Sequence, residues 1–299
     1  MNTSGLRISG PVDEFTVPVT AHMPDTLTGQ FDTILLCVKS QHTISAMQQL
    51  AHHLTPDGYV VSVQNGLNEL DISKIVGAER TIGAFVNFGA DYVEAGHIHR
   101  GNRATVVIGE LNGIQSTRIE TLHRILQDFD DNAQITENIF GFLWGKVAYG
   151  AQLFATALTN DSIADALANP KFSAVYIGLA REALTVARTQ QIVALGFDGF
   201  DPSGFAPDAD PAASKKSLAE MVTFNRASAK THSGVWRDLA VRKRRTEVDF
   251  FQPVLDVARE NGVAVLLITR LVQLIHDIEN GDREQSDANL EVLLGVMAE

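Results

Sequence analysis

A lysine in an apolar setting is the first residue whose type and surroundings could do chemistry. Lys146 ends the run Phe142-Leu-Trp-Gly-Lys146, so its ammonium group must either reach solvent along its own stem or face a cleft. Desolvation lowers the pKa of a lysine towards neutrality, and such a group can give a proton and a positive charge to an oxyanion. The alternative is a surface lysine on an amphipathic helix, which the residues by themselves favour.

Two polar pairs follow apolar segments of strand length. Lys39-Ser40 comes after the segment 32–38, and Asn65-Gly66 comes after the segment 59–63. The carboxyl ends of parallel strands are where open α/β sheets bind ligands, so these four residues are candidates for a ligand site. The alternatives are ordinary turns, above all for Asn-Gly, which is a very common turn dipeptide.

Sequence patterns for nucleotide and metal sites are missing from the chain. Neither Gly-x-Gly-x-x-Gly nor Gly-x-x-x-x-Gly-Lys-Ser/Thr occurs in it, so these residues alone support no nucleotide site. His52 and His53 are adjacent and would point apart on a helix, and the pair His97 and His99 has no accompanying carboxylate motif. We therefore expect no metal site.

The chain up to residue 138 alternates strand and helix patterns. Apolar runs predict strands over 32–38, 59–63, 80–88 and 104–108, and helical spacing predicts helices over 43–54 and 116–129. Thr-Pro-Asp-Gly at 55–58 predicts a turn, and Gly10-Pro11 predicts a hairpin between 5–8 and 14–19. Strands that alternate with helices predict a parallel, doubly wound sheet, with the strand 32–38 buried on both faces.

The second half is almost entirely helical in its pattern. Helical spacing predicts helices over 140–158, 172–190, 214–231, 242–261 and 263–279, with a loop rich in Gly, Pro and Asp over 196–211. The expected organisation is an α/β domain over residues 1–138, followed by an all-helical domain over residues 139–299.

The composition is that of a globular protein, with 45% hydrophobic and 20% charged residues among 299. A formal net charge of −12 makes nucleic acid and an anionic membrane surface poor partners. The one cysteine, Cys37, excludes an intramolecular disulfide, and its apolar neighbours lead us to expect it buried. No apolar segment is long enough to span a bilayer, and we expect a cytoplasmic protein.

Four short segments occur in an order and at a spacing that resemble the ketopantoate reductase family, the NADPH-dependent 2-dehydropantoate 2-reductases. They are DTILLCVKS (32–40), VQNGL (63–67), WGK (144–146) and RTEVD (245–249). The resemblance covers nearly the whole chain. It implies an oxidoreductase of pantothenate biosynthesis that reduces a 2-oxo acid such as 2-dehydropantoate (ketopantoate) to pantoate. It also implies a Rossmann-like NADP-binding domain, then a helical domain like that of 6-phosphogluconate dehydrogenase, with a homodimer as one assembly.

The resemblance implies roles for individual residues. Lys146 matches the family's catalytic lysine, which protonates the alkoxide left by hydride transfer. Glu247 matches a glutamate that binds substrate hydroxyls and holds that lysine; here it lies within the predicted helix 242–261, beside four basic residues that we expect to be solvated or salt-bridged. Lys39 and Asn65, with Ser40 and Gly66 beside them, match residues that bind cofactor and substrate.

Three positions depart from the family pattern. The family usually has asparagines four and eight residues after the lysine, on the same helical face, where this chain has Gly150 and Phe154. We expect these substrate-binding positions to leave room and apolar contact for a bulkier substrate. The family also has a pair of substrate-binding serines; Ser233 matches the first, and Gly234 stands in place of the second. The alternative for Ser233 is a helix N-cap.

The glycine fingerprint is the largest departure. In the family, a β-α-β unit that carries the fingerprint precedes the segment that matches Gly5-Leu-Arg-Ile8, which here follows Met1 almost at once. We therefore expect an N-terminally truncated Rossmann-like domain that binds NADPH weakly or not at all and exposes an apolar strand edge. A non-catalytic family member that acts only by association, or not at all, is the alternative to an active reductase.

Overall fold

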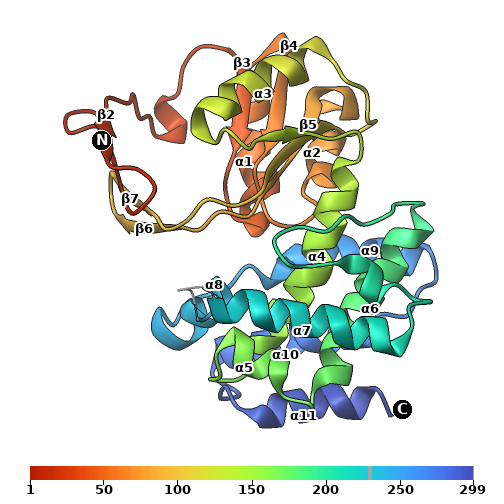
Figure 1. Ribbon diagram of the computed structural model, residues 1–299. Coiled ribbons are helices and arrows are strands. Elements are labelled where there is room, and N and C mark those ends of the chain that lie inside the picture. The colour runs from red at the N-terminus through yellow and green to blue at the C-terminus, as the bar shows by residue number, and fades with distance from the viewer. Residues whose placement is uncertain (228–230, 299) are drawn as a thin grey trace. The chain divides into compact units, whose positions relative to one another are not determined.

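The computed structural model describes residues 1–227 and 231–298 and divides into two compact units (Figure 1). The first unit consists of Met1–Val38, His42–Gln64 and Glu69–Ile139. The second consists of the segments Lys39–Gln41 and Asn65–Asn68 together with the chain from Phe140 onward. The two polar pairs at the predicted strand ends therefore group with the helical unit, although the strands before them belong to the first unit.

The first unit contains a five-stranded sheet in the order β3-β4-β5-β8-β9. Its strands are β3 (Phe31–Leu36), β4 (Leu54–Ser62), β5 (Thr81–Val86), β8 (Val106–Glu110) and β9 (Gln134–Ile135). The α/β class is confirmed, but an entirely parallel sheet is wrong at one pairing, because β5 and β8 are antiparallel. Parallel neighbours need a crossover connection, whereas the chain between β5 and β8 forms a hairpin of another sheet.

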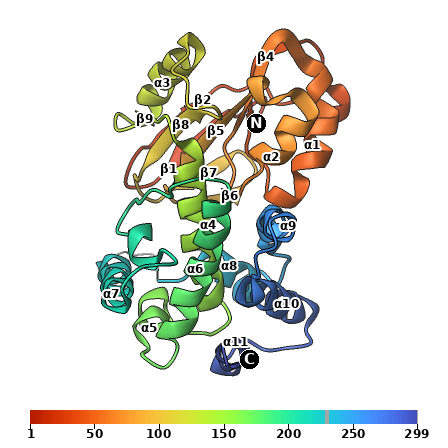
Figure 2. The same cartoon turned by 90° about the vertical axis from the view of Figure 1, so that its right-hand side faces the viewer.

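Helices cover both faces of this sheet, as Figure 2 shows. They are α1 (Thr43–Leu50), α2 (Glu69–Val76) and α3 (Thr117–Phe129). Alternation along β4 places Val61 in a core with Ile119 of α3, and Val60 in a second core with Met47 and Ile72 of the other two helices. The predicted helix 116–129 is confirmed, and the Ser116 hydroxyl caps it by accepting a hydrogen bond from the backbone N–H of Ile119.

The strand β3 lies at the edge of the sheet, so the expectation of a strand buried on both faces is wrong. Leu36 is buried, but Leu35 is 53% exposed. Cys37, which follows directly, is exposed rather than buried. The apolar run was typical of a central strand, but among the described residues β3 has a hydrogen-bonded neighbour strand on one side only.

The predicted turn at 55–58 lies inside β4. The pairing of β3 with β4 shifts from Phe31–Leu54 to Thr33–Tyr59, so the residues between Leu54 and Tyr59 bulge out of the ladder. The predicted helix 43–54 is shorter than expected: α1 ends at Leu50, and a single 3₁₀ turn over Ala51–His53 leads into β4.

A second, four-stranded sheet has the order β2-β1-β7-β6. Its strands are β1 (Leu6–Ser9), β2 (Phe15–Val17), β6 (Ala90–Glu94) and β7 (His97–Arg100). The predicted hairpin around Gly10-Pro11 is confirmed as the antiparallel pair β1 and β2. β7 pairs with β1 on its other side, in parallel.

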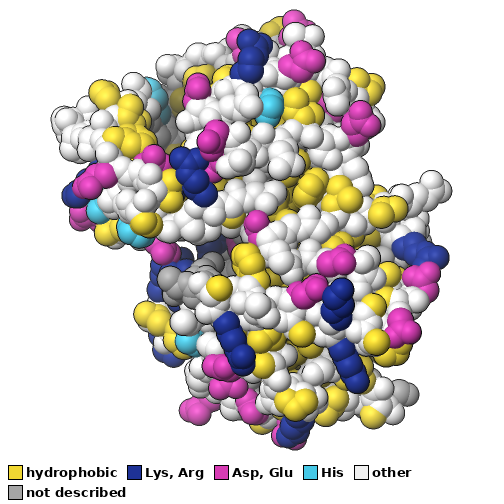
Figure 3. Space-filling model, viewed as in Figure 1, with side chains coloured by type: hydrophobic (Ala, Val, Ile, Leu, Met, Phe, Trp, Pro, Cys, Tyr) yellow, Lys and Arg dark blue, Asp and Glu magenta, His cyan; other side chains and the backbone are white. Residues whose placement is uncertain are grey.

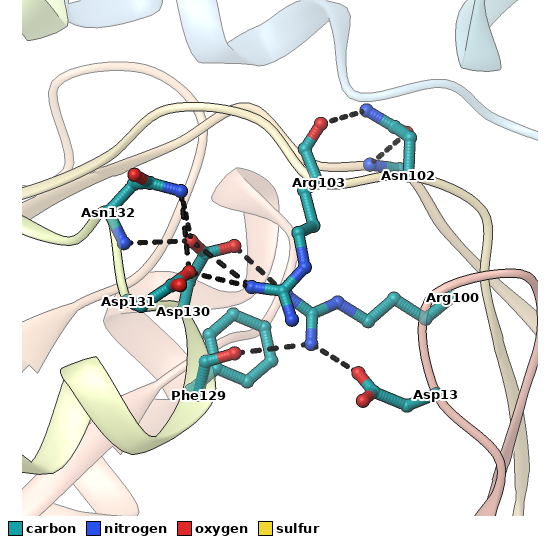
Figure 4. Close-up of polar contacts among 9 residues, drawn as sticks. Asp13, Arg100, Asn102, Arg103, Phe129, Asp130, Asp131 and Asn132 are labelled. Carbon is teal, nitrogen blue, oxygen red and sulfur yellow. Dashed lines mark hydrogen bonds and ion pairs between the residues drawn. The ribbon is translucent and has the colours of Figure 1, made fainter.

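A buried ion-pair network joins this sheet to the end of α3 (Figure 4). The Arg100 guanidinium binds Asp13 at 2.7 Å and the buried Asp130 at 3.1 Å, and it lies 4.1 Å from the centre of the Phe129 ring. Arg103 also reaches Asp130, at 3.6 Å, but from the solvent side. Arg100 is therefore the buried cationic partner of Asp130, whereas Arg103 is about half exposed.

We expect Arg100→Met to destabilise the first unit by about 3 kcal/mol, because it leaves Asp130 buried beside only a partly exposed partner. Both tryptophans lie in the second unit, so tryptophan fluorescence would not report on the first unit. The stability of the first unit is instead measured by amide exchange of β8 under rising urea. The control is Arg103→Met, whose side chain is 47% exposed and whose loss should cost under about 1 kcal/mol. Equal losses for the two variants would contradict the role of Arg100.

The second unit is helical, as expected. Its helices are α4 (Ile139–Thr156), α5 (Ile163–Ala168), α6 (Ser173–Thr189), α7 (Pro211–Ala227), α8 (Gly234–Trp236), α9 (Gln252–Glu260), α10 (Leu266–Asn280) and α11 (Asp287–Val296). Residues 228–230, at the end of the predicted helix 214–231, lie outside the described residues. The short helices α5 and α8 and the helix α11 were not predicted. α4 is apolar almost all round and correspondingly buried.

The predicted helix 242–261 is wrong over its first half. Residues 242–247 form no helix, Lys243 has a left-handed backbone with φ of +49°, and a 3₁₀ turn over Val248–Phe251 leads into α9. The arginines of this segment bind carboxylates instead of following helical spacing: Arg242 and Arg244 bind Asp238. Glu247 is therefore placed by an irregular segment and not by a helix.

On the helical unit, in the lower half of Figure 3, basic side chains are interspersed with acidic ones. None of the helices in the described part of the chain is both long and apolar enough to cross a lipid bilayer.

Candidate active site

A hydrogen bond joins two of the predicted site residues across the sequence. The Asn65 side-chain amide donates to Oε1 of Glu247 at 2.9 Å, although the two residues are 182 positions apart. Asn68 fixes Asn65 by donating to its backbone carbonyl at 2.7 Å, and Asn68 itself accepts a hydrogen bond from the Ser40 hydroxyl at 2.6 Å. Ser40, Asn65 and Glu247 thus lie in one polar network, through an asparagine that the sequence analysis did not single out.

Asp238 is a second residue that the sequence analysis missed. It is buried and binds Lys39 Nζ at 2.9 Å, Arg242 Nη1 at 3.0 Å and Arg244 Nε at 2.8 Å. Burial alone would raise the pKa of Asp238, but the hydrogen bonds from these three cations outweigh it and hold the pKa below its usual value. The signal in the sequence was the basic cluster itself, which is salt-bridged as expected.

Lys146 lies half-buried on α4, among the buried residues Trp144 and Val147. Gly150 and Phe154 follow it by four and eight residues, which places them on the same face of the helix.

The space beside Gly150 is filled by Phe250, another residue that the sequence analysis missed. A Cβ atom on Gly150 would lie 3.1 Å from Phe250 Cζ, and one on Gly66 would lie 3.0 Å from Phe250 Cδ2. Phe154 is 4% exposed, and its ring centre lies 5.2 Å from that of Phe250 and 5.3 Å from that of Phe251. The expected room next to Gly150 is therefore occupied by an aromatic ring.

Ser233 adopts the alternative geometry considered from the sequence. It is the N-cap of α8, and its hydroxyl accepts a hydrogen bond from the backbone N–H of Trp236 at 3.1 Å. Its side chain is buried, so a substrate would reach it only after local movement.

The residues at the ends of β3 and β4 suit a polar ligand, but the described residues offer no glycine-rich turn for a pyrophosphate. Lys39 and Asn65 follow β3 and β4, and an ammonium group and an amide at such strand ends suit a polar ligand. The loop from β3 to α1 contains no glycine, and no glycine-rich turn joins a strand to a helix N-terminus in residues 1–227 and 231–298. The pyrophosphate of a dinucleotide therefore has no recognisable cradle here. No group of three or more metal-ligating side chains occurs in the same residues.

Two family models and a curated relative match this chain over most of its length. The ketopantoate reductase PanE/ApbA model matches residues 1–113, and the model of the C-terminal part of the same family matches residues 138–279. A 2-dehydropantoate 2-reductase of Archaeoglobus fulgidus is 26% identical over 281 residues, which cover 93% of this chain and 85% of the relative.

Solved structures share the fold. A PanE/ApbA family ketopantoate reductase of Ralstonia eutropha JMP134 has a TM-score of 0.76 at 21% identity, covering 94% of this chain and 87% of its own. D-mandelate dehydrogenase with NADH and anilino(oxo)acetate has a TM-score of 0.78 at 18% identity, covering 94% and 86%.

These findings define an oxidoreductase class whose members carry a mixed α/β unit and a helical unit. The chain belongs to the ketopantoate reductase family.

Proposed function

We propose that the protein reduces a 2-oxo acid, such as 2-dehydropantoate, to the 2-hydroxy acid with NADPH. The observation that supports this most is the 2.9 Å hydrogen bond between Asn65 and Glu247, because both residues match the family's site motifs. NADPH as the reductant and a homodimer as the assembly are carried over from the family and belong to the same proposal.

The chain's own residues have distinct tasks in this proposal. When bound, the nicotinamide cofactor supplies hydride chemistry. Lys146 gives a proton to the carbonyl oxygen of the substrate as negative charge develops there, and its own charge stabilises that oxygen. Glu247 accepts a hydrogen bond from a substrate hydroxyl, and Asn65 orients the Glu247 carboxylate.

The test is an assay of the purified protein with NADPH and 2-dehydropantoate, followed by the loss of NADPH absorbance and by identification of pantoate. NADPH titration in the absence of substrate separates the two interpretations of the chain. Binding and turnover support the reductase. A folded protein that binds no NADPH supports the association-only alternative instead.

A second candidate substrate is a 2-oxo acid with an apolar or aromatic side chain. Gly150 and Phe154 stand where the family has asparagines, and Phe250 packs against both, so the two rings would contact or shape a site for such a side chain. D-mandelate dehydrogenase, which shares the fold, has been solved with anilino(oxo)acetate, a 2-oxo acid with an aromatic substituent.

The double variant Gly150→Asn/Phe154→Asn tests this preference. We expect the ratio of kcat/KM for 2-dehydropantoate over phenylglyoxylate, an aromatic 2-oxo acid, to rise about tenfold, because two amides return to the face beyond Lys146. The control Gly150→Ala/Phe154→Leu crowds Phe250 and removes the Phe154 ring without adding an amide, and should raise the ratio less than the double asparagine variant does. An unchanged ratio in the double variant would show that these positions do not select the substrate.

A further inference from the structure

Glu279 is a buried acid in a place that disfavours an acid. It lies in the last turn of α10, where the helix dipole is negative, and its side chain is 1% exposed. Both conditions raise the free energy of a carboxylate, so an ionised Glu279 requires hydrogen-bond donors that compensate for this cost.

Four donors surround the carboxylate. Oε1 accepts from the backbone N–H and from the hydroxyl of Thr246, both at 2.7 Å. Oε2 lies 2.8 Å from Arg245 Nη1 and 2.9 Å from His276 Nδ1. Burial alone would raise the pKa of Glu279, but these hydrogen bonds outweigh it and keep the pKa below its ordinary value, so the group is a carboxylate at neutral pH.

These contacts fix the chain on both sides of Glu247. Thr246 precedes Glu247 directly, and its hydroxyl also accepts a hydrogen bond from the backbone N–H of Val248 at 3.2 Å. The segment 242–247 forms no helix, so no regular ladder of backbone hydrogen bonds holds it. Glu279 supplies the missing partner for the Thr246 N–H.

We propose that Glu279 is a positioning residue: it holds Thr246 and Arg245 so that the Glu247 carboxylate points at Asn65. The part of this inference that concerns substrate rests on the proposed function of Glu247. The part that concerns the backbone does not, because it follows from the contacts of Thr246.

The test compares Glu279→Gln with wild-type protein. A glutamine has one oxygen, and the charged Arg245 binds that oxygen more strongly than the two donors of Thr246 do, so the amide nitrogen faces Thr246. We expect the Thr246 amide to exchange roughly tenfold faster, as for the loss of about one hydrogen bond. We also expect KM for 2-dehydropantoate, whose hydroxyl Glu247 would bind, to rise about tenfold to a hundredfold, with a smaller change in kcat.

Thr246→Val removes the hydroxyl and repeats the test if Glu279→Gln fails to fold; Thr246→Ser, which keeps the hydroxyl, should restore both measurements. Asp277→Asn is the matched control, because it also neutralises an acid of α10 but contacts Gln273 and Arg283 instead. It should change neither the exchange nor KM.

The outcomes are separable. Unchanged exchange of Thr246 in Glu279→Gln overturns the inference, whatever the activity. Faster exchange with an unchanged KM overturns the link from Glu279 to substrate. If exchange is faster in Glu279→Gln but the wild-type protein binds neither 2-dehydropantoate nor phenylglyoxylate, the proposed function is overturned. The role of Glu279 in holding Thr246 is then still supported.

Discussion

Replacement of Lys146 by alanine is expected to lower the kcat for reduction of the 2-oxo acid by at least about a hundredfold, as for a lost general acid. The variant loses both the proton and the positive charge offered to the developing oxyanion. The affinity for NADPH should stay nearly unchanged, because this proposal gives Lys146 no part in holding the cofactor. The measurements are steady-state turnover and NADPH titration, on a form of the protein that binds NADPH.

Two further variants separate the roles of Lys146. Lys146→Arg keeps the positive charge, but a guanidinium group holds its proton too tightly to act as a general acid. Compared with Lys146→Ala, this variant should therefore restore substrate affinity more than kcat. Lys216→Ala, on the surface of α7, is the control and should behave as wild type. Turnover close to wild type in Lys146→Ala would remove this residue from the mechanism.

The fold elements that depend on local patterns could be predicted from the sequence. The helix 116–129 had helical apolar spacing, and the structure has α3 there. The segment 242–261 also had helical spacing, but Lys243 is left-handed, and the arginines beside it bind Asp238 and Glu279. Those tertiary contacts override the local helical preference, and they cannot be inferred from a local sequence pattern.

Part of the candidate site could also be predicted from the sequence, and part of it could not. Lys39, Asn65 and Glu247 were selected by type and by resemblance, and the structure joins each of them to a partner far away in the sequence. Phe250 was not selected, because an aromatic residue in a segment of helical apolar spacing is typical of a core. Its relevance to the site is visible only in the structure, where its ring packs against Gly66 and Gly150, two glycines from distant segments.

A buried carboxyl group in the first unit leads to the second large effect. Glu69, at the start of α2, is 0% exposed, and neither of its oxygens accepts a hydrogen bond of normal geometry from a described residue. Burial raises the pKa of Glu69 to about 8, against a weaker opposing effect of its own backbone N–H and of the Ser62 hydroxyl. The folded unit therefore holds Glu69 protonated at neutral pH.

The sign of the pH dependence follows from that raised pKa. In the unfolded chain the group titrates near 4.5, so between about 4.5 and 8 the unfolded state loses a proton that the folded state keeps. The contribution of Glu69 to stability is complete below this window and falls as the pH rises through it, by up to about 5 kcal/mol. The measurement is the free energy of opening of β4 and β5, obtained from amide exchange under urea at several pH values between 5 and 8.

Glu69→Gln carries no titrating proton and should flatten this dependence, so that its stability advantage over wild type grows from pH 5 to pH 8. Asp71→Asn, two residues further along α2, removes a partly exposed carboxylate that binds Lys74, and should keep the wild-type slope. A wild-type unit whose stability does not fall over this range, or a Glu69→Gln variant with the same slope as wild type, would show that Glu69 ionises in the folded protein without cost. In that case a polar partner must reach its carboxylate in solution, because a charge buried without one would destabilise the unit.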